Sequence, residues 1–452
     1  MTLRVVILAA GKGKRMASSM PKVMHALGGV TMLERVVAIA ESLSPTKIHV
    51  VYGNGGSALP QALPHLPVDW VFQKEQLGTG HAVMQALPAC RDDERVLVLY
   101  GDVPLISKRT LQLLLKETPK QSIGLLVTEV DNPAGFGRIV RDHEDNIVGI
   151  IEEKDATRAQ RAIKEINTGI VTAPAQFLKK CLPKLSNKNA QKEYYLTDMI
   201  ALAVEDGVAV RGISAMNSHE ASGVNDQWQL VTLERHYQQE LARELAYNGV
   251  TIMDPARLDI RGDVSIQPSA KLDINIILEG NVFIGAGCDI GPNVVIKNSK
   301  IGANVKIFAN SVIEGAVIEE GCEVGPFARV RAETILKTKS KIGNFVETKK
   351  TVLGENSKAS HLTYLGDAVI GKNVNVGAGT ITCNYDGANK WTTEIGDGAF
   401  IGSNTSLIAP IKIGKNATIA AGSAVSKSAP AEQLTLTRAE QKTVKTWKRP
   451  SK

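Results

Sequence analysis

Aliphatic residues recur at every sixth position through much of the second half of the chain. A period of six fits neither the alternation of a half-buried strand nor the 3.6-residue turn of an amphipathic helix. It is the period of a parallel β-helix, in which each strand of a triangular coil points one aliphatic side chain inward. The register slips twice and then resumes; the positions are Ile260, Ile266, Leu272, Leu278, Ile284, Ile290, Ile296, then Ile301, Ile307, Ile313, then Ile318, Val324, Val330, Leu336, Ile342, and last Ile395, Ile401, Leu407, Ile413, Ile419 and Val425.

Residues 260–425 are therefore expected to form about nine stacked coils, with strands of successive coils paired roughly 4.8 Å apart. Glycine often follows the aliphatic residue, as in Ile284-Gly285 and Ile413-Gly414. Glycine or asparagine suits the tight corners of such a coil, where a larger side chain strains the backbone.

The rhythm fails between Ile342 and Ile370 and again near 384–391. Interruptions of a repeat commonly hold functional residues. The first contains His361, the only histidine after residue 249, and the second begins at Asn384 and Tyr385. A single histidine is more often structural than catalytic, but this position favours a general base, because imidazole accepts a proton near neutral pH.

The first half alternates apolar runs with helical patterns. Strands are predicted at 5–8, 47–52 and 95–100, and an amphipathic helix at 31–43. This alternation indicates a doubly wound α/β sheet, in which ligands bind beyond the carboxyl ends of the strands. Gly11 and Asp102 each follow such a strand. Asp102 could instead cap a helix.

A long helical pattern covers residues 227–247 and ends at Asn248-Gly249, a good stop signal. It divides the chain into residues 1–227, a helical linker at 228–248, and residues 249–452. Two interpretations stay open for this helix: a rigid arm between two domains, or a core element of the first domain.

Length and composition agree with a protein of two or three domains. The chain has 452 residues, 43% of them hydrophobic, and a net charge of +7 that favours anionic partners. Basic residues do not interleave with stacking aromatics, so nucleic acid is not expected. Five dispersed cysteines indicate no disulfide framework or zinc site. The apolar run 5–10 is too short for a signal peptide and no segment reaches a membrane span, so a cytoplasmic protein without a membrane partner is expected.

The loop Gly11-x-Gly13 lacks the closing residues of a Walker loop and the third glycine of a dinucleotide fingerprint. A purely structural loop is one interpretation. Arg15 and Lys22 favour another, because a glycine-rich loop lets backbone N–H groups approach phosphates while nearby cations neutralise their charge. Arg15 could also be a solvated surface charge.

Several motifs together resemble the sugar-phosphate nucleotidyltransferases. The resemblance then extends over nearly the whole chain to the bacterial bifunctional enzymes that make UDP-N-acetylglucosamine. It implies an N-terminal Rossmann-like nucleotidyltransferase sheet, a long linker helix and a C-terminal left-handed parallel β-helix of hexapeptide repeats. The motifs are Leu8–Met16 with Pro21-Lys22, Gln73–His81, Tyr100–Pro104, Gly135–Ile139, Glu165–Gly169 and Gly223–Asn225.

By this resemblance, the first domain joins N-acetylglucosamine-1-phosphate to UTP and releases pyrophosphate. Arg15 and Lys22 would act on the α-phosphate, and Asp102 and Asn225 would bind Mg²⁺. Asn225 could instead cap the following helix together with Asp226. The other residues implied in binding UTP and UDP-N-acetylglucosamine are Leu8, Ala9, Ala10, Gly11, Gln73, Gly78, Thr79, Tyr100, Gly101, Gly137, Glu152 and Asn167. Lys14 departs from the family pattern, which has threonine there.

The second domain would first acetylate glucosamine-1-phosphate with acetyl-CoA, and His361 would be its base. With no serine or cysteine nucleophile evident, direct transfer is favoured over an acyl-enzyme. The resemblance implies Arg331, Lys349, Tyr364, Asn375 and Asn384 for the sugar phosphate, and Ala378, Asn384, Tyr385, Ser403, Ala421 and Arg438 for acetyl-CoA. Ser360 and Ala332-Glu333 stand where the family has glycine and Pro-Gly.

The family assembles as homotrimers, so a homotrimer is expected. The basic tail from Lys442 to Lys452 could bind the phosphates of CoA or be a solvated end. Two rival functions stay open: a single-activity nucleotidyltransferase whose β-helix only oligomerises, and a non-catalytic scaffold.

Overall fold

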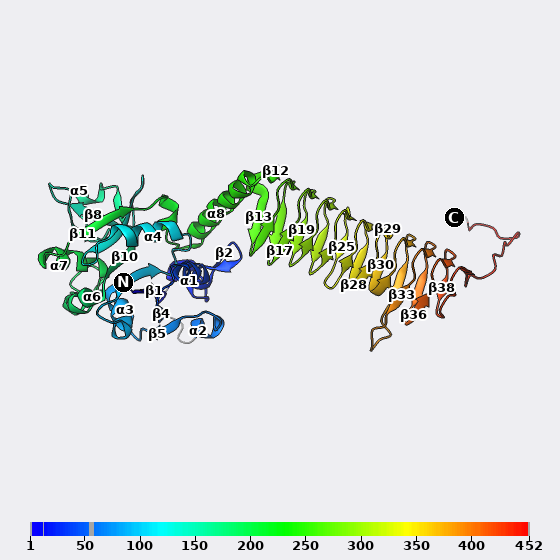
Figure 1. The fold of residues 1–452 in the computed structure, drawn as a ribbon, viewed down its shortest axis with the longest axis horizontal. Coiled ribbons are helices and arrows are strands. Elements are labelled where there is room, and N and C mark those ends of the chain that lie inside the picture. Colours follow the sequence, from blue (N-terminus) through cyan, green and yellow to red (C-terminus); the bar gives the residue numbers. More distant parts are fainter. Residues whose placement is uncertain (1, 12, 54–57, 451–452) are drawn as a thin grey trace. The chain divides into compact units, whose positions relative to one another are not determined.

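A computed structural model describes residues 2–11, 13–53 and 58–450. The chain divides into two compact units, Met1–Tyr237 and Gln238–Lys452. Each unit has its own hydrophobic core. In Figure 1 the first unit is blue to green and the second is green to red.

The first unit is built on a mixed sheet with the order β11-β7-β10-β6-β1-β4-β5. β1 runs parallel to β4 and β6, whereas β10 runs antiparallel to β6 and β7. The three strands predicted from the sequence are confirmed as β1, β4 and β6. The strands are β1 Leu3–Leu8, β4 Lys47–Tyr52, β5 Asp69–Phe72, β6 Arg95–Tyr100, β7 Ile123–Glu129, β8 Gly137–Arg141, β9 Ile147–Ile151, β10 Glu165–Pro174 and β11 Val210–Ser214, with a small hairpin of β2 Ala26–Leu27 and β3 Val30–Thr31.

Helices cover both faces of this sheet. Along β1, Val6 and Leu8 enter one core, and Val5 and Ile7 enter the other, because successive strand side chains point to opposite faces. The predicted doubly wound arrangement is thus confirmed. The helices are α1 Met32–Ser42, α2 Ala58–Ala62, α3 Thr79–Ala86, α4 Lys108–Glu117, α5 Arg158–Arg161, α6 Ala175–Cys181 and α7 Met199–Glu205.

The helix predicted at 227–247 is α8 Gln227–Tyr247. Asp226 caps it, since its Oδ1 accepts a hydrogen bond from Gln229 N at 2.8 Å. Leu233 packs in a small core of the first unit, and Ala242 is buried in the core of the second. The helix therefore contributes residues to the core of each unit.

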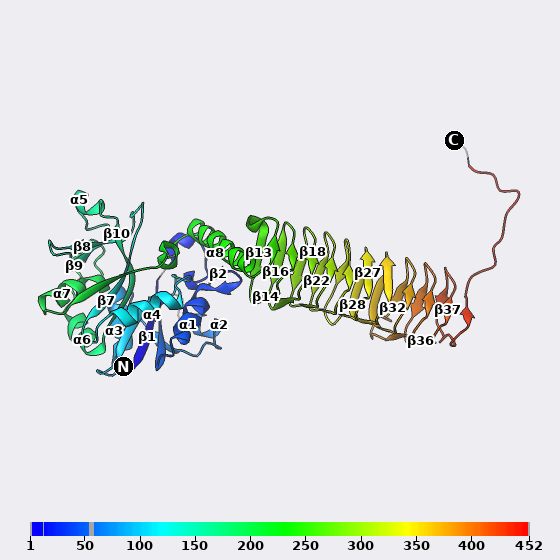
Figure 2. The ribbon, with the colours of Figure 1, turned by 45° about the horizontal axis from the view of Figure 1, so that its top comes forward.

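The second unit is a parallel β-helix, as the six-residue period predicted (Figure 2). One face is an eleven-stranded parallel sheet, and nine of its strands lie within residues 260–425, so the expected number of about nine coils in that range is confirmed. Its strands are β12 Thr251–Ile252, β15 Lys271–Leu272, β18 Asp289–Ile290, β21 Lys306–Ile307, β24 Glu323–Val324, β27 Lys341–Asn344, β29 Lys358–His361, β31 Asn375–Val376, β34 Phe400–Ile401, β37 Thr418–Ile419 and β39 Leu434–Thr435.

The remaining strands of the second unit form a seventeen-stranded parallel sheet. They are β13 Leu258–Arg261, β14 Val264–Ile266, β16 Ile276–Glu279, β17 Val282–Ile284, β19 Val295–Lys297, β20 Lys300–Ile301, β22 Val312–Glu314, β23 Val317–Ile318, β25 Arg329–Val330, β26 Ile335–Leu336, β28 Glu347–Leu353, β30 Tyr364–Ile370, β32 Ile381–Cys383, β33 Thr393–Ile395, β35 Ser406–Ile408, β36 Ile411–Ile413 and β38 Ala424–Val425.

The first predicted interruption of the repeat is not an interruption of the coil. Between Ile342 and Ile370 the inward positions are taken by Thr348, Leu353, Ala359 and Leu365, all of which are fully buried. The strands there keep their parallel pairing, so the prediction of a break was wrong. The aliphatic rhythm lapses there because Thr348 and Ala359 occupy two of the inward positions.

The second interruption is a true excursion. Residues 384–391 leave the coil as a hairpin in which Tyr385 and Lys390 form an antiparallel bridge. The predicted use of asparagine at corners is confirmed, since Asn293, Asn304 and Asn310 have φ of 59°, 56° and 61°. None of the helices that the structure describes has the length and apolar content of a membrane span.

Candidate functional site

The first group of candidate residues lies at the carboxyl ends of β1 and β6. Lys22, in a short 3-10 helix Lys22–Met24, donates from Nζ to Asp102 Oδ2 and, at 3.3 Å, to Asn225 Oδ1. The Asp102 carbonyl accepts from Val224 N at 2.9 Å, which ties the two segments together. Asp102 Oδ2 and Asn225 Oδ1 thus converge on the positively charged ammonium group of Lys22.

Neither oxygen is occupied in capping a helix. The helix after Asp102, α4, is capped by Ser107, whose side chain accepts from Thr110 N. The helix after Asn225 is capped by Asp226 instead. Both side chains are therefore available to the cluster around Lys22.

Gln73, Gly78 and Thr79 are gathered at the start of α3. Gln73 is 2% exposed and its Nε2 lies 3.4 Å from Gly78 O. Gly78 has φ of 115°, and a Cβ there would lie 2.6 Å from Tyr194 O, so only glycine fits. Thr79 Oγ1 accepts from Leu196 N at 3.0 Å. At the neighbouring strand ends, Ala9 N donates to Val51 O and Gly101 N to Leu8 O.

The residues implied in sugar binding surround Glu152. Its Oε1 accepts from Thr197 Oγ1 at 3.0 Å, and a Cβ on Gly137 would lie 3.5 Å from either carboxylate oxygen. Desolvation raises the pKa of Glu152. Desolvation, followed by the charges of Glu152 and Asp102, raises the pKa of Tyr100, so these groups share one neighbourhood. Tyr100, Asn167 and Thr197 line one recess there.

Arg15 does not pair with the residues around Lys22 or Glu152. It is exposed in the 3-10 helix Lys14–Met16, and in the described part of the chain it forms no ion pair. The solvated-charge interpretation therefore describes Arg15 in the absence of substrate.

In the second unit, cations gather where a sugar phosphate was expected. Arg331 pairs through Nη1 with Glu347 Oε1 at 2.8 Å. The ammonium of Lys390, followed by the guanidinium of Arg331, holds the pKa of Lys349 below its usual range. Like charges held this close favour an anion between them. Lys390 was not among the residues expected from the sequence.

Tyr364 and Asn384 meet beside this group of cations. A Cβ on Gly366 would lie 2.4 Å from Tyr364 Oη and 2.8 Å from Asn384 Nδ2, so glycine leaves room for both. Asn384 Nδ2 donates to Asp367 Oδ2 at 2.5 Å, and both residues are only 8% exposed. Asp367 therefore fixes the orientation of the Asn384 amide.

His361 ends β29 and is exposed at a corner of the prism. Its Nδ1 lies 2.8 Å from Asn344 Oδ1 on the preceding coil. Asn375 lies on β31, the next strand of the same face, where it pairs with Lys358 of β29.

The residues expected to bind acetyl-CoA extend along the same corner. Their backbones are joined coil by coil: Gly379 N donates to Leu362 O at 3.0 Å, Asn404 N to Ala378 O at 2.7 Å and Gly422 N to Ser403 O at 2.8 Å. A Cβ on Gly402 would lie 2.4 Å from Ala421 N, and one on Gly422 would lie 3.7 Å from Arg438 Cδ. Tyr385 is 61% exposed in the hairpin. His361, Ala378, Ser403, Ala421 and Arg438 thus form one column.

The side chains that sequence reasoning missed are Thr197, Asn344, Glu347, Asp367 and Lys390. Two of them could have been found from their positions in the sequence. Asn344 precedes His361 by 17 residues, which is one coil, and Lys390 lies within the second interruption. Thr197 could not, because it reaches Glu152 only through the fold.

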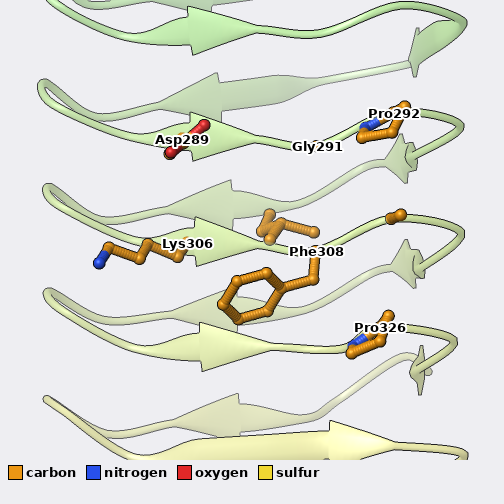
Figure 3. A pocket seen from close by; sticks show the side chains of 8 residues that line it. Asp289, Gly291, Pro292, Lys306, Phe308 and Pro326 are labelled. Carbon is orange, nitrogen blue, oxygen red and sulfur yellow. The ribbon is translucent and has the colours of Figure 1, made fainter.

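A recess of about 350 Å³ lies elsewhere on the prism, around Phe308 (Figure 3). Among the residues that the structure describes, its charged lining residues are Asp289 and Lys306, and Pro292 and Pro326 flank it. Without an imidazole or converging polar groups, this recess is not a candidate active site.

The fold and these two clusters define a nucleotidyltransferase joined to a hexapeptide-repeat acyltransferase. The family described as "MobA-like NTP transferase domain" matches residues 5–199. "GMPPB C-terminal domain" matches residues 260–342, and "Bacterial transferase hexapeptide (six repeats)" matches residues 392–427.

Full-length relatives identify the family. The chain is 59% identical to the bifunctional protein GlmU of Coxiella burnetii over all of both chains. It is 52% identical to that of Legionella pneumophila and 51% to that of Marinobacter nauticus, covering 100% of this chain and 99% of each relative. The chain belongs to the family of bifunctional GlmU proteins. It is a bifunctional uridyltransferase and acetyltransferase of UDP-N-acetylglucosamine biosynthesis, and its second unit is a left-handed β-helix.

Proposed function

We propose that residues 1–227 perform the uridylyl transfer, that residues 228–248 link the domains, and that residues 249–452 perform the acetyl transfer. The observation that carries this assignment is the presence of two separate polar clusters. One gathers Lys22, Asp102 and Asn225, and the other gathers Arg331, Lys349 and Asn384 beside the exposed His361.

In the acetyl transfer, the neutral amine of glucosamine-1-phosphate attacks the thioester carbon of acetyl-CoA. The new C–N bond forms as the C–S bond breaks, and CoA leaves as a thiolate. His361 Nε2 accepts the proton from the amine and returns it to the thiolate. Arg331, Lys349 and Lys390 bind the sugar phosphate, while Tyr364, Asn375 and Asn384 position the sugar ring and its amine.

The column from Ala378 through Ser403 and Ala421 to Arg438 is the proposed groove for CoA, with Tyr385 at its side. Its small residues leave the corner of the prism open along several coils. The exposed residues 442–450 supply lysines and an arginine suited to the CoA phosphates. Cytoplasmic location follows from the two substrates, UTP and acetyl-CoA.

In the uridylyl transfer, a phosphate oxygen of N-acetylglucosamine-1-phosphate attacks the α-phosphorus of UTP. The bond to the leaving pyrophosphate breaks as the new P–O bond forms. Lys22 and Arg15 neutralise the charge that spreads over the α-phosphate oxygens. Leu8, Ala9, Ala10, Gly11, Gln73, Gly78, Thr79 and Gly101 bind the nucleotide, and Tyr100, Gly137, Glu152, Asn167 and Asn225 bind the sugar.

The donor set around Lys22 fits Mg²⁺. Asp102 Oδ2 and Asn225 Oδ1 both contact the Lys22 ammonium, so one cation can reach both oxygens. One carboxylate, one amide and substrate phosphates are a common ligand set for this ion. When bound, Mg²⁺ would neutralise charge on the triphosphate. Lys22 would then turn toward the α-phosphate.

A homotrimer is supported by an apolar stripe along the prism. Phe308, Phe327, Phe345 and Leu362 are 39%, 49%, 56% and 62% exposed, and the rings of Phe327 and Phe345 stack at 5.2 Å. Further copies of the chain would cover this stripe. Changing Phe345 to glutamate should lower the mass measured by sedimentation, and an unchanged mass would count against this packing.

Two variants test the assignment. His361→Ala should abolish acetyl transfer and leave uridylyl transfer intact, and Asp102→Asn should do the reverse. Acetyl transfer that survives in His361→Ala would refute His361 as the base, whereas no acetyl transfer by the unmodified protein would leave the single-activity alternative. No pyrophosphate from the unmodified protein with UTP, Mg²⁺ and N-acetylglucosamine-1-phosphate would leave the scaffold alternative.

A further inference from the structure

The side chain that His361 contacts through Nδ1 comes from the coil before it. Asn344 ends β27 and His361 ends β29, and the two residues face each other in the parallel register of these strands. Leu362 N donates to Asn344 O at 3.1 Å, and His361 Nδ1 lies 2.8 Å from Asn344 Oδ1. The contact therefore joins two groups whose backbones are also held together.

The local backbone explains why these two side chains meet. Asn344 and His361 each precede a corner residue in the left-handed region, since Phe345 has φ of 56° and Leu362 of 46°. Gly343 lets the coils approach, because a Cβ there would lie 1.9 Å from Ser360 O. Both side chains consequently leave the prism at one corner, one coil apart.

The contact determines which ring nitrogen carries the proton. An amide oxygen only accepts hydrogen bonds, so Nδ1 must donate to Asn344 Oδ1. In a neutral imidazole the other nitrogen, Nε2, then holds the free lone pair. This is the form that can take a proton from an amine.

Glu347, the carboxylate on the next strand of the same coil, does not fill this role. It is paired with Arg331 at 2.8 Å. The backbone of His361 is also fixed, because its carbonyl accepts from Thr363 Oγ1 at 2.7 Å. Asn344 is a neutral partner, so it orients the ring without favouring the imidazolium as a carboxylate would.

We propose that Asn344 is a positioning residue of the acetyltransferase, and that its side-chain oxygen holds His361 as the tautomer whose Nε2 accepts the proton of the amino sugar. The inference rests on the proposed role of His361 as the base. Asn344 acts through the imidazole.

Two substitutions of Asn344 separate orientation from bulk. Asn344→Leu keeps the number and branching of the side-chain heavy atoms and removes the acceptor; kcat for acetyl transfer should fall on the order of 10²-fold, as expected for a misoriented base. KM for glucosamine-1-phosphate and for acetyl-CoA should change little. Asn344→Asp keeps an acceptor and adds a charge that favours the imidazolium. It should restore kcat at alkaline pH and move the acidic limb of the pH–rate profile up by about one unit or more.

Three results would bear on the idea separately. An Asn344→Leu variant with unchanged kcat and pH profile would overturn it. An Asn344→Asp variant inactive at every pH would also overturn it, since Asn344 would then be a donor to Nδ1. Acetyl transfer that survives in His361→Ala would instead refute the proposed base. The urea-unfolding midpoint of the second unit reports whether the prism of each variant is folded, and uridylyl transfer by the same preparations reports only on the first unit.

Discussion

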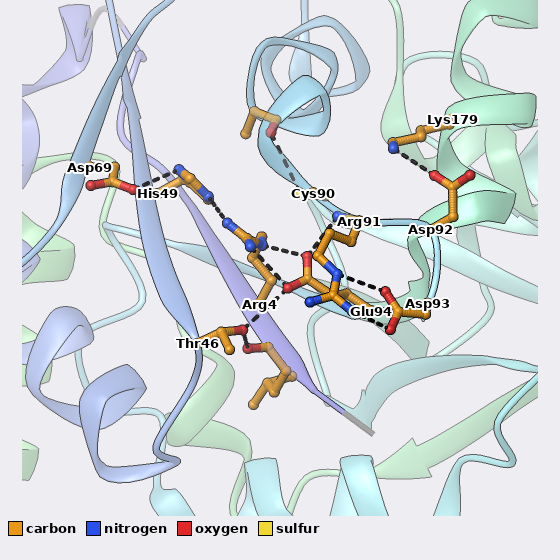
Figure 4. A network of polar contacts seen from close by, with 12 residues as sticks. Arg4, Thr46, His49, Asp69, Cys90, Arg91, Asp92, Asp93, Glu94 and Lys179 are labelled. Carbon is orange, nitrogen blue, oxygen red and sulfur yellow. Dashed lines mark hydrogen bonds and ion pairs between the residues drawn. The ribbon is translucent and has the colours of Figure 1, made fainter.

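A buried network at the amino-terminal edge of the first sheet allows a stability prediction (Figure 4). Arg4 on β1 donates from Nε and Nη2 to the two carboxylate oxygens of Glu94 at 2.7 and 2.9 Å. Arg91 N adds a third donor at 2.7 Å. Glu94 is 2% exposed, and the hydrogen bond from Arg4 is the largest cause that lowers its pKa.

The substitution Glu94→Gln keeps the shape and removes the charge. One acceptor oxygen becomes an NH₂ group that faces the donors of Arg4, and the guanidinium is left buried without its counter-ion. Removing one partner of a buried pair costs about 3–5 kcal/mol. For a unit of this size each kcal/mol lowers Tm by about 2–4 °C, so we expect a decrease of about 6–20 °C.

The two activities report on the two units separately. After brief heating at increasing temperatures, residual uridylyl transfer should be lost earlier in Glu94→Gln, and residual acetyl transfer should follow the unmodified protein. Asp93→Asn is the matched control, since Asp93 pairs with Arg91 with both side chains exposed. Such pairs contribute about 0–1 kcal/mol. If Glu94→Gln and Asp93→Asn lose uridylyl transfer at the same temperature, the reasoning is wrong.

Three further predictions concern His49, the prism core and the coil spacing. Burial, followed by the positive charge of Arg4, lowers the pKa of His49; the charge of Lys47 acts in the same direction, and those of Asp69 and Glu94 oppose it. Near this pKa the unfolded chain binds more protons than the folded one, so the first unit should lose heat stability as pH falls below about 6.5. His49→Gln should make the stability of the first unit less dependent on pH between pH 8 and 5.5. Ile313 is fully buried (0% exposed), so Ile313→Ala should lower the free energy of unfolding of the second unit in urea by about 2–5 kcal/mol. Val317→Ala, at a position that is 41% exposed, should lower it much less. Gly343→Ala forces the coils apart, because its Cβ would meet Ser360 O at 1.9 Å. The substitution should lower acetyl transfer and destabilise the prism by about 1–3 kcal/mol without affecting uridylyl transfer. An unchanged thermal midpoint of the second unit would contradict this prediction.

Most residues of the candidate site of the first unit could be predicted from the sequence. Asp102 and the loop after β1 follow two parallel neighbouring strands, and the topology brings such strand ends to one edge of the sheet. The contact of Lys22 with both Asp102 and Asn225 was not accessible, because Asn225 joins from a segment far along the chain. The pairing of Thr197 with Glu152 depends in the same way on packing between distant segments.

The sequence alone determined the prism, because every coil buries the same position and the period of six is a local property of the chain. It also indicated those left-handed corners that are occupied by asparagine or glycine, but not the corners at Phe345 and Leu362, whose residue types do not favour that conformation. Only the tertiary structure decided whether the coil is broken at His361, because threonine and alanine can fill the interior once neighbouring coils surround them. It alone decided the partner of His361, since the stacking of one coil on the next sets which side chains meet across a corner.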